Sequence, residues 1–274
     1  MGFVQSDTGV PQIVAIANQK GGVGKTTTAI NLATALAAVG KRVAVIDLDP
    51  QGNASTGLGI PMELRKVTAY HVLAGEATVG QAMIATVIPG LSVVPASVDL
   101  SGAEIELVEV KEREFLLRKA LRGDLPVLDY VLIDCPPGLG LLSLNALVAA
   151  DAVLVPLQCE FLALEGLSHL VKTIERVRRA LNPALKLQGV VLTMYDRRNI
   201  LSKSVASDAR AYFGDMVYET VIPRNVRISE APSHGLPVLL YDHRSAGAMA
   251  YIRLAREILR RADKAPLATP ETWE

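Results

Sequence analysis

The sequence is poor in cysteine and carries no net charge. Its only cysteines, Cys135 and Cys159, lie in apolar runs and lack the spacing of a metal-binding or redox pair. We therefore expect buried free thiols, as in a protein of a reducing compartment. The formal net charge is zero, so the chain as a whole does not indicate a nucleic-acid or membrane partner. Any such binding has to come from a local group of residues.

Long hydrophobic runs and targeting segments are also missing. No uncharged stretch reaches the roughly 18 residues that a membrane-spanning helix needs. The first ten residues lack the basic and apolar regions of a secretion signal. These absences predict a cytoplasmic protein. The four histidines show no metal-ligand spacing, so we expect no histidine metal centre.

One stretch, residues 19–27, carries the clearest chemistry, because QKGGVGKTT lies between an apolar run and a helix-forming run. Glycines allow a tight turn whose amides face a phosphate, a lysine ammonium meets the outer phosphates, and a threonine hydroxyl can bind Mg²⁺. The sequence therefore predicts a P-loop for a nucleoside triphosphate. The expected nucleotide-binding residues of this loop are Gly21, Gly22, Val23, Gly24, Lys25, Thr26 and Thr27.

Short apolar runs alternate with amphipathic ones, which predicts an α/β fold with a mostly parallel twisted sheet and helices on both faces. We expect one domain over 13–261, a flexible N-terminus over 1–12 and a disordered tail over 262–274. Residues 50–90 lack a clear period and are expected to form loops and short helices. Strands are expected near 13–17, 42–49, 91–95, 130–134, 152–157, 189–194 and 220–222, and helices near 27–39, 101–122, 139–149, 161–180, 201–213 and 246–262.

Acidic residues end two of the expected strands. Asp47 and Asp49 come at the end of strand 42–49, and Asp134 ends strand 130–134. In parallel sheets ligands bind at the carboxyl ends of the strands. A carboxylate there can hold a magnesium-bound water or orient the water that attacks a phosphate. Two plainer alternatives stay open: Asp134 as a helix cap, and the other pair as a solvated strand end.

Four segments together resemble the ParA/Soj family, the deviant Walker-A ATPases of the MinD/ParA superfamily. They are the loop at 19–27, DLDPQGN at 47–53, IDCPP at 133–137 and IPRNVRISEAPSHG at 222–235. The resemblance runs from about residue 13 to 261 in the family's order. It implies a P-loop NTPase fold, ATP and Mg²⁺ as cofactors, and slow ATP hydrolysis that a partner stimulates.

The resemblance also implies roles for individual residues. The usual motif has glycine where this chain has Gln19, and Lys20 beside it matches the lysine that reaches across an ATP-dependent dimer. That role fits because a second ammonium in the loop would otherwise only repel Lys25. By the same resemblance the catalytic residues are Lys20, Lys25 and Asp49, and the metal site holds Thr26, Asp47 and Asp134.

For the adenine, the resemblance implies Met194, Pro223 and Asn225. An amide and backbone atoms beside an apolar wall suit the edge of a purine. Turn formation also explains Pro223 and Asn225, so both interpretations stay open.

For nucleic acid, Arg198 and Arg227 match residues of the family that contact DNA. Basic residues exceed acidic ones only modestly between 196 and 261, and a solvated charged face is the plain alternative. A dimer would double this patch into a surface for sequence-independent phosphate binding. No recognition-helix motif indicates base readout.

The resemblance thus implies an ATPase that dimerises on ATP, binds double-stranded DNA nonspecifically and drives chromosome or plasmid segregation. A ParB-like centromere-binding partner would stimulate the hydrolysis that resets it, and the protein would be cytoplasmic and nucleoid-associated. The alternative is a MinD-like membrane-associated positioning ATPase, whose basic amphipathic helix at 246–262 would bind lipid. We expect this helix to pack on the sheet instead, through Met249, Ile252, Ala255 and Leu259, because it carries no Phe or Trp.

Overall fold

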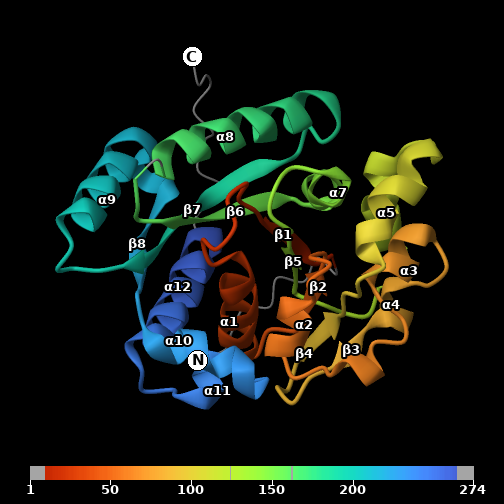
Figure 1. Ribbon diagram of the computed structural model, residues 1–274, viewed down its shortest axis with the longest axis horizontal. Coiled ribbons are helices and arrows are strands. Elements are labelled where there is room, and N and C mark those ends of the chain that lie inside the picture. Colours follow the sequence, from red (N-terminus) through yellow and green to blue (C-terminus); the bar gives the residue numbers. More distant parts are fainter. Residues whose placement is uncertain (1–9, 124, 162, 264–274) are drawn as a thin grey trace.

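A computed structural model describes residues 10–123, 125–161 and 163–263. An eight-stranded sheet runs through these residues in the order β3-β4-β2-β5-β1-β6-β7-β8, with helices on both faces (Figure 1). Neighbouring strands pair in parallel except β3 and β4, which pair antiparallel at one edge. The α/β fold class and the mostly parallel sheet expected from the sequence are confirmed.

The strands and helices have the following bounds. The strands are β1 Gln12–Ile16, β2 Val43–Asp47, β3 Ile84–Ala85, β4 Leu91–Val94, β5 Tyr130–Asp134, β6 Ala152–Gln158, β7 Lys186–Tyr195 and β8 Val217–Pro223. The α-helices are α1 Lys25–Ala38, α2 Asn53–Gly57, α3 Ala69–Ala74, α4 Val79–Ala82, α5 Leu100–Glu106, α6 Leu116–Leu121, α7 Leu141–Ala149, α8 Ala163–Ala180, α9 Ile200–Phe213, α10 Val226–Glu230, α11 Val238–Tyr241 and α12 Ala246–Asp263. Short 3₁₀ turns span η1 Met62–Leu64, η2 Leu107–Glu109, η3 Arg113–Phe115, η4 Gly214–Met216 and η5 Ala231–His234.

Two differences from the expected elements have physical causes. The single helix expected near 101–122 is broken into α5, two 3₁₀ turns and α6, and Glu112 between them has a left-handed backbone with φ 55° that an α-helix cannot contain. The edge strand β3 was not expected, because two residues are too short to show a period.

The described residues include only a small part of the two expected flexible ends. Most of the expected flexible N-terminus (1–12) and most of the expected tail (262–274) lie outside the described residues, while β1 begins at Gln12 and α12 ends at Asp263. No helix in the described part of the chain is long and apolar enough to cross a membrane.

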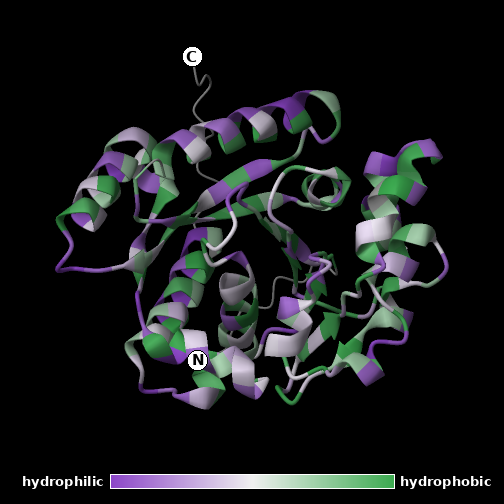
Figure 2. Ribbon diagram, in the orientation of Figure 1, coloured by the Kyte–Doolittle hydropathy of each residue, from purple (hydrophilic) through white to green (hydrophobic). Residues whose placement is uncertain are grey.

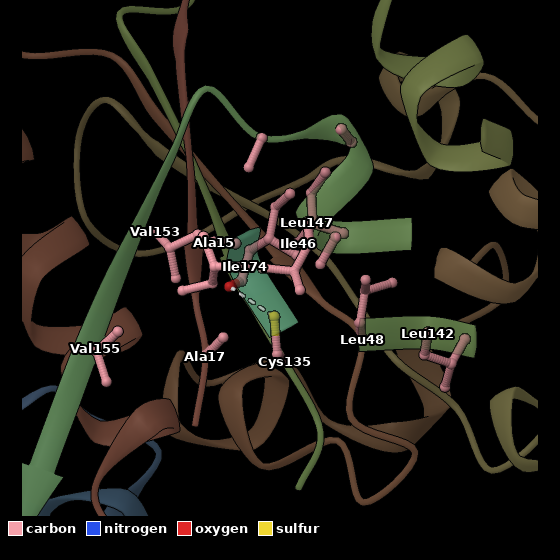
Figure 3. Packing of buried hydrophobic residues seen from close by; sticks show 14 of the residues in the cluster. Ala15, Ala17, Ile46, Leu48, Cys135, Leu142, Leu147, Val153, Val155 and Ile174 are labelled. Carbon is pink, nitrogen blue, oxygen red and sulfur yellow. Dashed lines mark hydrogen bonds between the residues drawn. The ribbon is translucent and has the colours of Figure 1, made fainter. Parts of the chain in front are cut away.

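The sheet buries one hydrophobic cluster on each face. Along β1, Val14 and Ile16 belong to the cluster beneath α1 and α12, whereas Ala15 belongs to the cluster beneath α7 and α8. Hydrophilic residues line the outer side of α8 (Figure 2). Cys135 packs in the second cluster with Ala17 (Figure 3), and both cysteines are buried free thiols, as expected. Alternate side chains of a central strand thus hold both helical layers to the sheet.

Helix α12 packs on the edge strand β8 and on α1, so the packed interpretation of this helix is confirmed. Of the face expected to be buried, Ala255 is buried and Ile252 and Leu259 are partly buried, but Met249 is exposed. The buried face is completed by Ala248, Tyr251, Leu254 and Ile258.

The buried carboxylate of Glu257 on α12 completes the edge of the sheet. It accepts hydrogen bonds from the backbone amides of Glu219, at 2.9 Å, and Thr220, at 3.0 Å. It also pairs at 2.8 Å with Arg261, whose guanidinium lies over the Tyr218 ring. These bonds lower the pKa of Glu257 even though its burial acts in the opposite direction.

Replacing Glu257 should therefore destabilise the protein. Glu257→Ala leaves two amides of β8 without their acceptor and removes the carboxylate that pairs with Arg261, which keeps its bonds to the Asp215 and Val217 carbonyls. We expect a loss of about 2 kcal/mol. Urea unfolding measures this change. Glu219→Ala, which removes a largely exposed carboxylate, is the matched control and should leave the midpoint unchanged. Equal midpoints for the two variants would contradict the prediction.

Candidate nucleotide-binding site

The glycine-rich loop connects β1, at the centre of the sheet, to the N-terminus of α1. Gly22 and Gly24 have left-handed backbones with φ 76° and 91°, and Gly24 is the N-cap of α1. Only glycine adopts these angles without strain. The loop therefore lies at the carboxyl ends of the strands, where the α1 N-terminus favours an anion.

Lys25 is buried within this loop. Its Nζ donates to the Lys20 carbonyl oxygen at 3.0 Å. Burial lowers the pKa of Lys25, and the nearby Asp134 carboxylate partly opposes that shift. The ammonium thus lies in the loop beside the α1 N-terminus, where it can meet a phosphate.

Two acidic residues lie side by side behind the loop, because Asp47 of β2 and Asp134 of β5 are register partners. Asp134 is fully buried, and neither carboxylate oxygen makes a hydrogen bond of normal geometry with the described residues. Burial is the main cause that raises the pKa of Asp134 well above its ordinary value, and the charge of Asp47 adds to the rise. The Thr26 side chain offsets part of this rise.

The oxygens of Asp47 are engaged instead. Oδ2 accepts from the Ser55 amide at 2.8 Å and hydroxyl at 2.7 Å, and Oδ1 accepts from the Asp49 amide at 3.2 Å. Burial raises the pKa of Asp47 to about 6 although the Ser55 bonds oppose it. Asp47 therefore orders the chain that follows β2.

These donors fit a magnesium ion. Mg²⁺ prefers hard oxygen ligands and keeps several waters. The Asp134 carboxylate beside Thr26 offers such oxygens, because neither makes a hydrogen bond of normal geometry with the described residues. Asp47 fits a supporting position better than an open ligand position, because both of its oxygens already accept hydrogen bonds. The expected metal residues thus lie close together, and Asp134 is better suited than Asp47 to bind the ion directly.

Asp49 and Lys20 differ in their exposure to solvent. Asp49 is mostly buried and accepts from the Gln51 amide at 3.0 Å. The Lys20 side chain is 55% exposed and forms an ion pair with Glu160, which follows β6. The Gly138 amide donates to the Gln19 carbonyl at 3.0 Å. The loop after β5 therefore rests directly on the phosphate loop.

The residues expected for adenine lie at the ends of β7 and β8. The Thr193 hydroxyl donates to the Val23 carbonyl at 2.8 Å, which joins β7 to the phosphate loop. Met194 follows with a left-handed backbone, φ 50°, and Pro223 ends the adjacent β8. Asn225 caps α10 by accepting from the Arg227 amide at 3.0 Å, so the turn-forming interpretation describes its side chain here.

The two arginines expected for DNA follow the same neighbouring strands, outside the phosphate loop. Arg198 is 91% exposed and pairs with Asp196 at 3.2 Å. Arg227 pairs with Glu230 at 2.9 Å and Asp242 at 3.5 Å. Both charges thus have acidic neighbours with which a DNA phosphate has to compete.

Sequence reasoning missed four residues that organise the site: Ser55, Thr193, Glu160 and Arg65. Each contacts a site residue or its loop from a distant or weakly patterned segment. The one available signal is that Thr193 and Glu160 each lie within two residues of the carboxyl end of a strand.

Known proteins resemble this chain along most of its length. A family described as AAA domain matches residues 11–187. The chromosome partitioning protein ParA of Caulobacter vibrioides is 64% identical over 91% of this chain and 94% of its own. The sporulation initiation inhibitor protein Soj of Bacillus subtilis is 53% identical over 90% of this chain and 98% of its own. A solved structure of cobyrinic acid a,c-diamide synthase from Mycobacterium smegmatis, with bound ATP analogue and magnesium, has a TM-score of 0.80 and 39% identity, covering 94% of this chain and 98% of that one.

Removing the Asp134 charge should stabilise the protein without ligands and impair its response to magnesium. Asp134→Asn removes a buried carboxylate that the Thr26 side chain stabilises only in part and that repels Asp47, so we expect a gain on the order of 1 kcal/mol at neutral pH. A raised folded-state pKa means that stability falls as the pH rises. For Asp47 that fall runs from the ordinary value of 3.8 through about 6. The variant should show a shallower fall.

Thermal unfolding with and without Mg-ATP measures both effects. The parent should be stabilised by Mg-ATP more than by ATP with EDTA, and Asp134→Asn should lose that difference. Asp215→Asn, at an exposed position, is the control. A full magnesium-dependent shift in Asp134→Asn would remove Asp134 from the metal site.

Proposed function

This chain belongs to the ParA/Soj family of chromosome-partitioning ATPases, and from that premise we propose an ATP-driven switch. ATP makes two copies dimerise, the dimer binds double-stranded DNA without sequence preference, and hydrolysis resets it. The observation that carries the proposal is the pair of lysines in one phosphate loop. Lys25 is buried in its own loop, while Lys20 has an exposed side chain that a second molecule can meet.

In the nucleotide site, the loop amides and Lys25 bind the β- and γ-phosphates, and Met194, Pro223 and Asn225 surround the adenine. Thr26 and Asp134 hold the magnesium ion, with Asp47 behind them. Magnesium there supplies positive charge to the phosphate oxygens. Asp49 orients the attacking water. Most of the rate then comes from positioning and electrostatics rather than from a covalent step.

Lys20 acts across the dimer. Within one molecule its ammonium pairs with Glu160, so reaching the partner's phosphates exchanges one negative partner for another. A phosphate chain carries more charge than a carboxylate, and the exchange is favourable only once a second copy with ATP is present. This dependence makes hydrolysis slow in the single molecule.

DNA binding uses Arg198 and Arg227. Each is paired with a carboxylate within the chain, and a dimer places two such sets on one surface. Contacts of this kind bind phosphates and do not read bases. The protein then associates with the nucleoid in the cytoplasm and carries chromosomal or plasmid DNA, and a ParB-like centromere-binding protein stimulates its hydrolysis.

The rival function is a MinD-like membrane-associated positioning ATPase. Its anchor would be α12, but Tyr251, Leu254 and Ile258 of this helix are already buried against the protein. Lipid binding would require that face to leave the core. Flotation with anionic liposomes under ATP tests this function, and we expect the protein to remain at the bottom of the gradient.

The switch predicts DNA binding that depends on the nucleotide. Cosedimentation with plasmid DNA should be strong under Mg-ATP and weak under Mg-ADP or without nucleotide. Lys25→Ala should lose ATP binding, and Lys20→Ala should keep it but stay monomeric in light scattering and fail to sediment with DNA. Lys186→Ala, at an exposed position at the start of β7, is the control. Equal DNA binding in all three nucleotide states would refute the switch.

Arg227→Ala should weaken DNA binding without changing ATP affinity. Losing one phosphate contact should flatten the slope of log affinity against log salt by about one unit. Fluorescence anisotropy with a random-sequence duplex at several salt concentrations measures this slope. The control Arg42→Ala removes another partly exposed, ion-paired arginine, which directly precedes β2, on the other side of β1 from β8. An unchanged slope for Arg227→Ala would exclude it from the DNA contact.

A further inference from the structure

We propose that Arg65 is a positioning residue for ATP hydrolysis, which holds residues 49–56 so that Asp49 keeps its place. The inference rests on the proposed function, in which Asp49 orients the attacking water. Arg65 follows the 3₁₀ turn η1 and is only 9% exposed. It lies in the stretch between 50 and 90 where the sequence pattern is weakest.

The hydrogen bonds that the Arg65 guanidinium donates all go to acceptors between residues 52 and 60. Nε and Nη2 both donate to the Ile60 carbonyl, at 3.1 and 2.7 Å. Nη2 also donates to the Thr56 hydroxyl at 2.8 Å, and Nη1 lies 3.4 Å from the Gly52 carbonyl. The planar fork thus ties together Gly52 before α2, Thr56 within it and Ile60 after it.

The contact with Gly52 is close enough to constrain the residue type. A Cβ added at this position would lie 2.4 Å from Nη1 of Arg65. Gly52 also has a left-handed backbone with φ 63°. The turn that follows Asp49 therefore ends on a glycine that packs directly against the guanidinium.

Asp49 lies between two anchored points. On one side, Asp47 binds the amide and hydroxyl of Ser55, and the Ser55 hydroxyl accepts from the Ala96 amide at 3.0 Å. On the other side, the Gly52 amide donates to the Asp49 carbonyl at 2.9 Å, and Arg65 contacts Gly52.

Removing the Arg65 side chain releases Gly52, whereas the hydrogen bonds between Asp47 and Ser55 remain. The Asp49 segment then gains freedom while the phosphate loop, which Arg65 does not contact among the described residues, stays intact. A displacement of about 1 Å in a reacting geometry costs up to about 100-fold in rate. Arg65 forms no ion pair with a described acidic residue, so its contacts serve the loop and not a surface charge pair.

Single-turnover hydrolysis of Mg-ATP, with protein in excess, tests the proposal in the full-length chain. Arg65→Ala should slow hydrolysis about 10- to 100-fold while the ATP dissociation constant stays within about threefold of the parent. Arg65→Lys should remain slow, because one ammonium cannot reproduce the fork. Arg42→Ala, which removes an arginine bonded to Asp129 in the same two-pronged way, should hydrolyse at the parental rate.

Two further measurements separate positioning from general stability. Low millimolar guanidinium should partly restore hydrolysis in Arg65→Ala and leave Arg42→Ala unchanged. The double variant Arg65→Ala/Asp49→Ala should be no slower than Asp49→Ala alone, because Arg65 acts through that residue. The proposal would be overturned if the rate losses of the two single variants multiplied in the double variant. It would also be overturned if Arg65→Ala hydrolysed ATP at the parental rate.

The outcomes also distinguish this inference from the proposed function. Parental hydrolysis by Asp49→Ala alone would overturn the catalytic role of Asp49 and, with it, the inference. Slow hydrolysis by Asp49→Ala together with fast hydrolysis by Arg65→Ala would overturn only the inference. An Arg65→Ala protein that fails to fold or to bind ATP would overturn it as well, because Arg65 would then stabilise the whole domain.

Discussion

The centre of this structure is organised by two carboxyl groups that are fully buried at the ends of neighbouring strands. Asp134 and Asp47 lie next to each other across two strands, away from solvent. The loop that should receive the phosphates places Lys25 and the N-terminus of α1 beside them. Burial raises the pKa of both carboxyls and lowers that of the lysine, so it disfavours the charged forms of all three groups. A bound cation and polyanion would offset this cost, which links the stability of the fold to ligand binding.

The sheet topology explains how remote segments reach this centre. Strands β5 and β6 flank β1, so the loops after both lie against the phosphate loop. Gly138 contacts Gln19 from one side, and Glu160 contacts Lys20 from the other. Strand β7 joins through Thr193 and Val23. The strand that leads to Arg198 is therefore bonded directly to the phosphate loop.

Much of the site could be predicted from the sequence, because its chemistry is local. Gly22 and Gly24 lie within three residues of Lys25 in the chain, and Asp134 directly ends an apolar strand. Glu160 and Arg65 could not be assigned in this way, since their roles depend on long-range contacts or on a segment without a period. The same limit applies to the fold. The long strands match their apolar runs, whereas the break of the helix expected near 101–122 depends on the left-handed Glu112.

The carboxylate of Glu257 has a consequence for assembly. Edge strands of open sheets expose backbone amides to which another chain can add a strand. Two amides of the edge strand β8 are already bonded to Glu257, and the opposite edge is the two-residue strand β3. A second chain therefore cannot pair with these amides of β8, and β3 is too short to pair with more than two residues. Copies of this chain that associate have to meet through side chains and ligand rather than through shared strands.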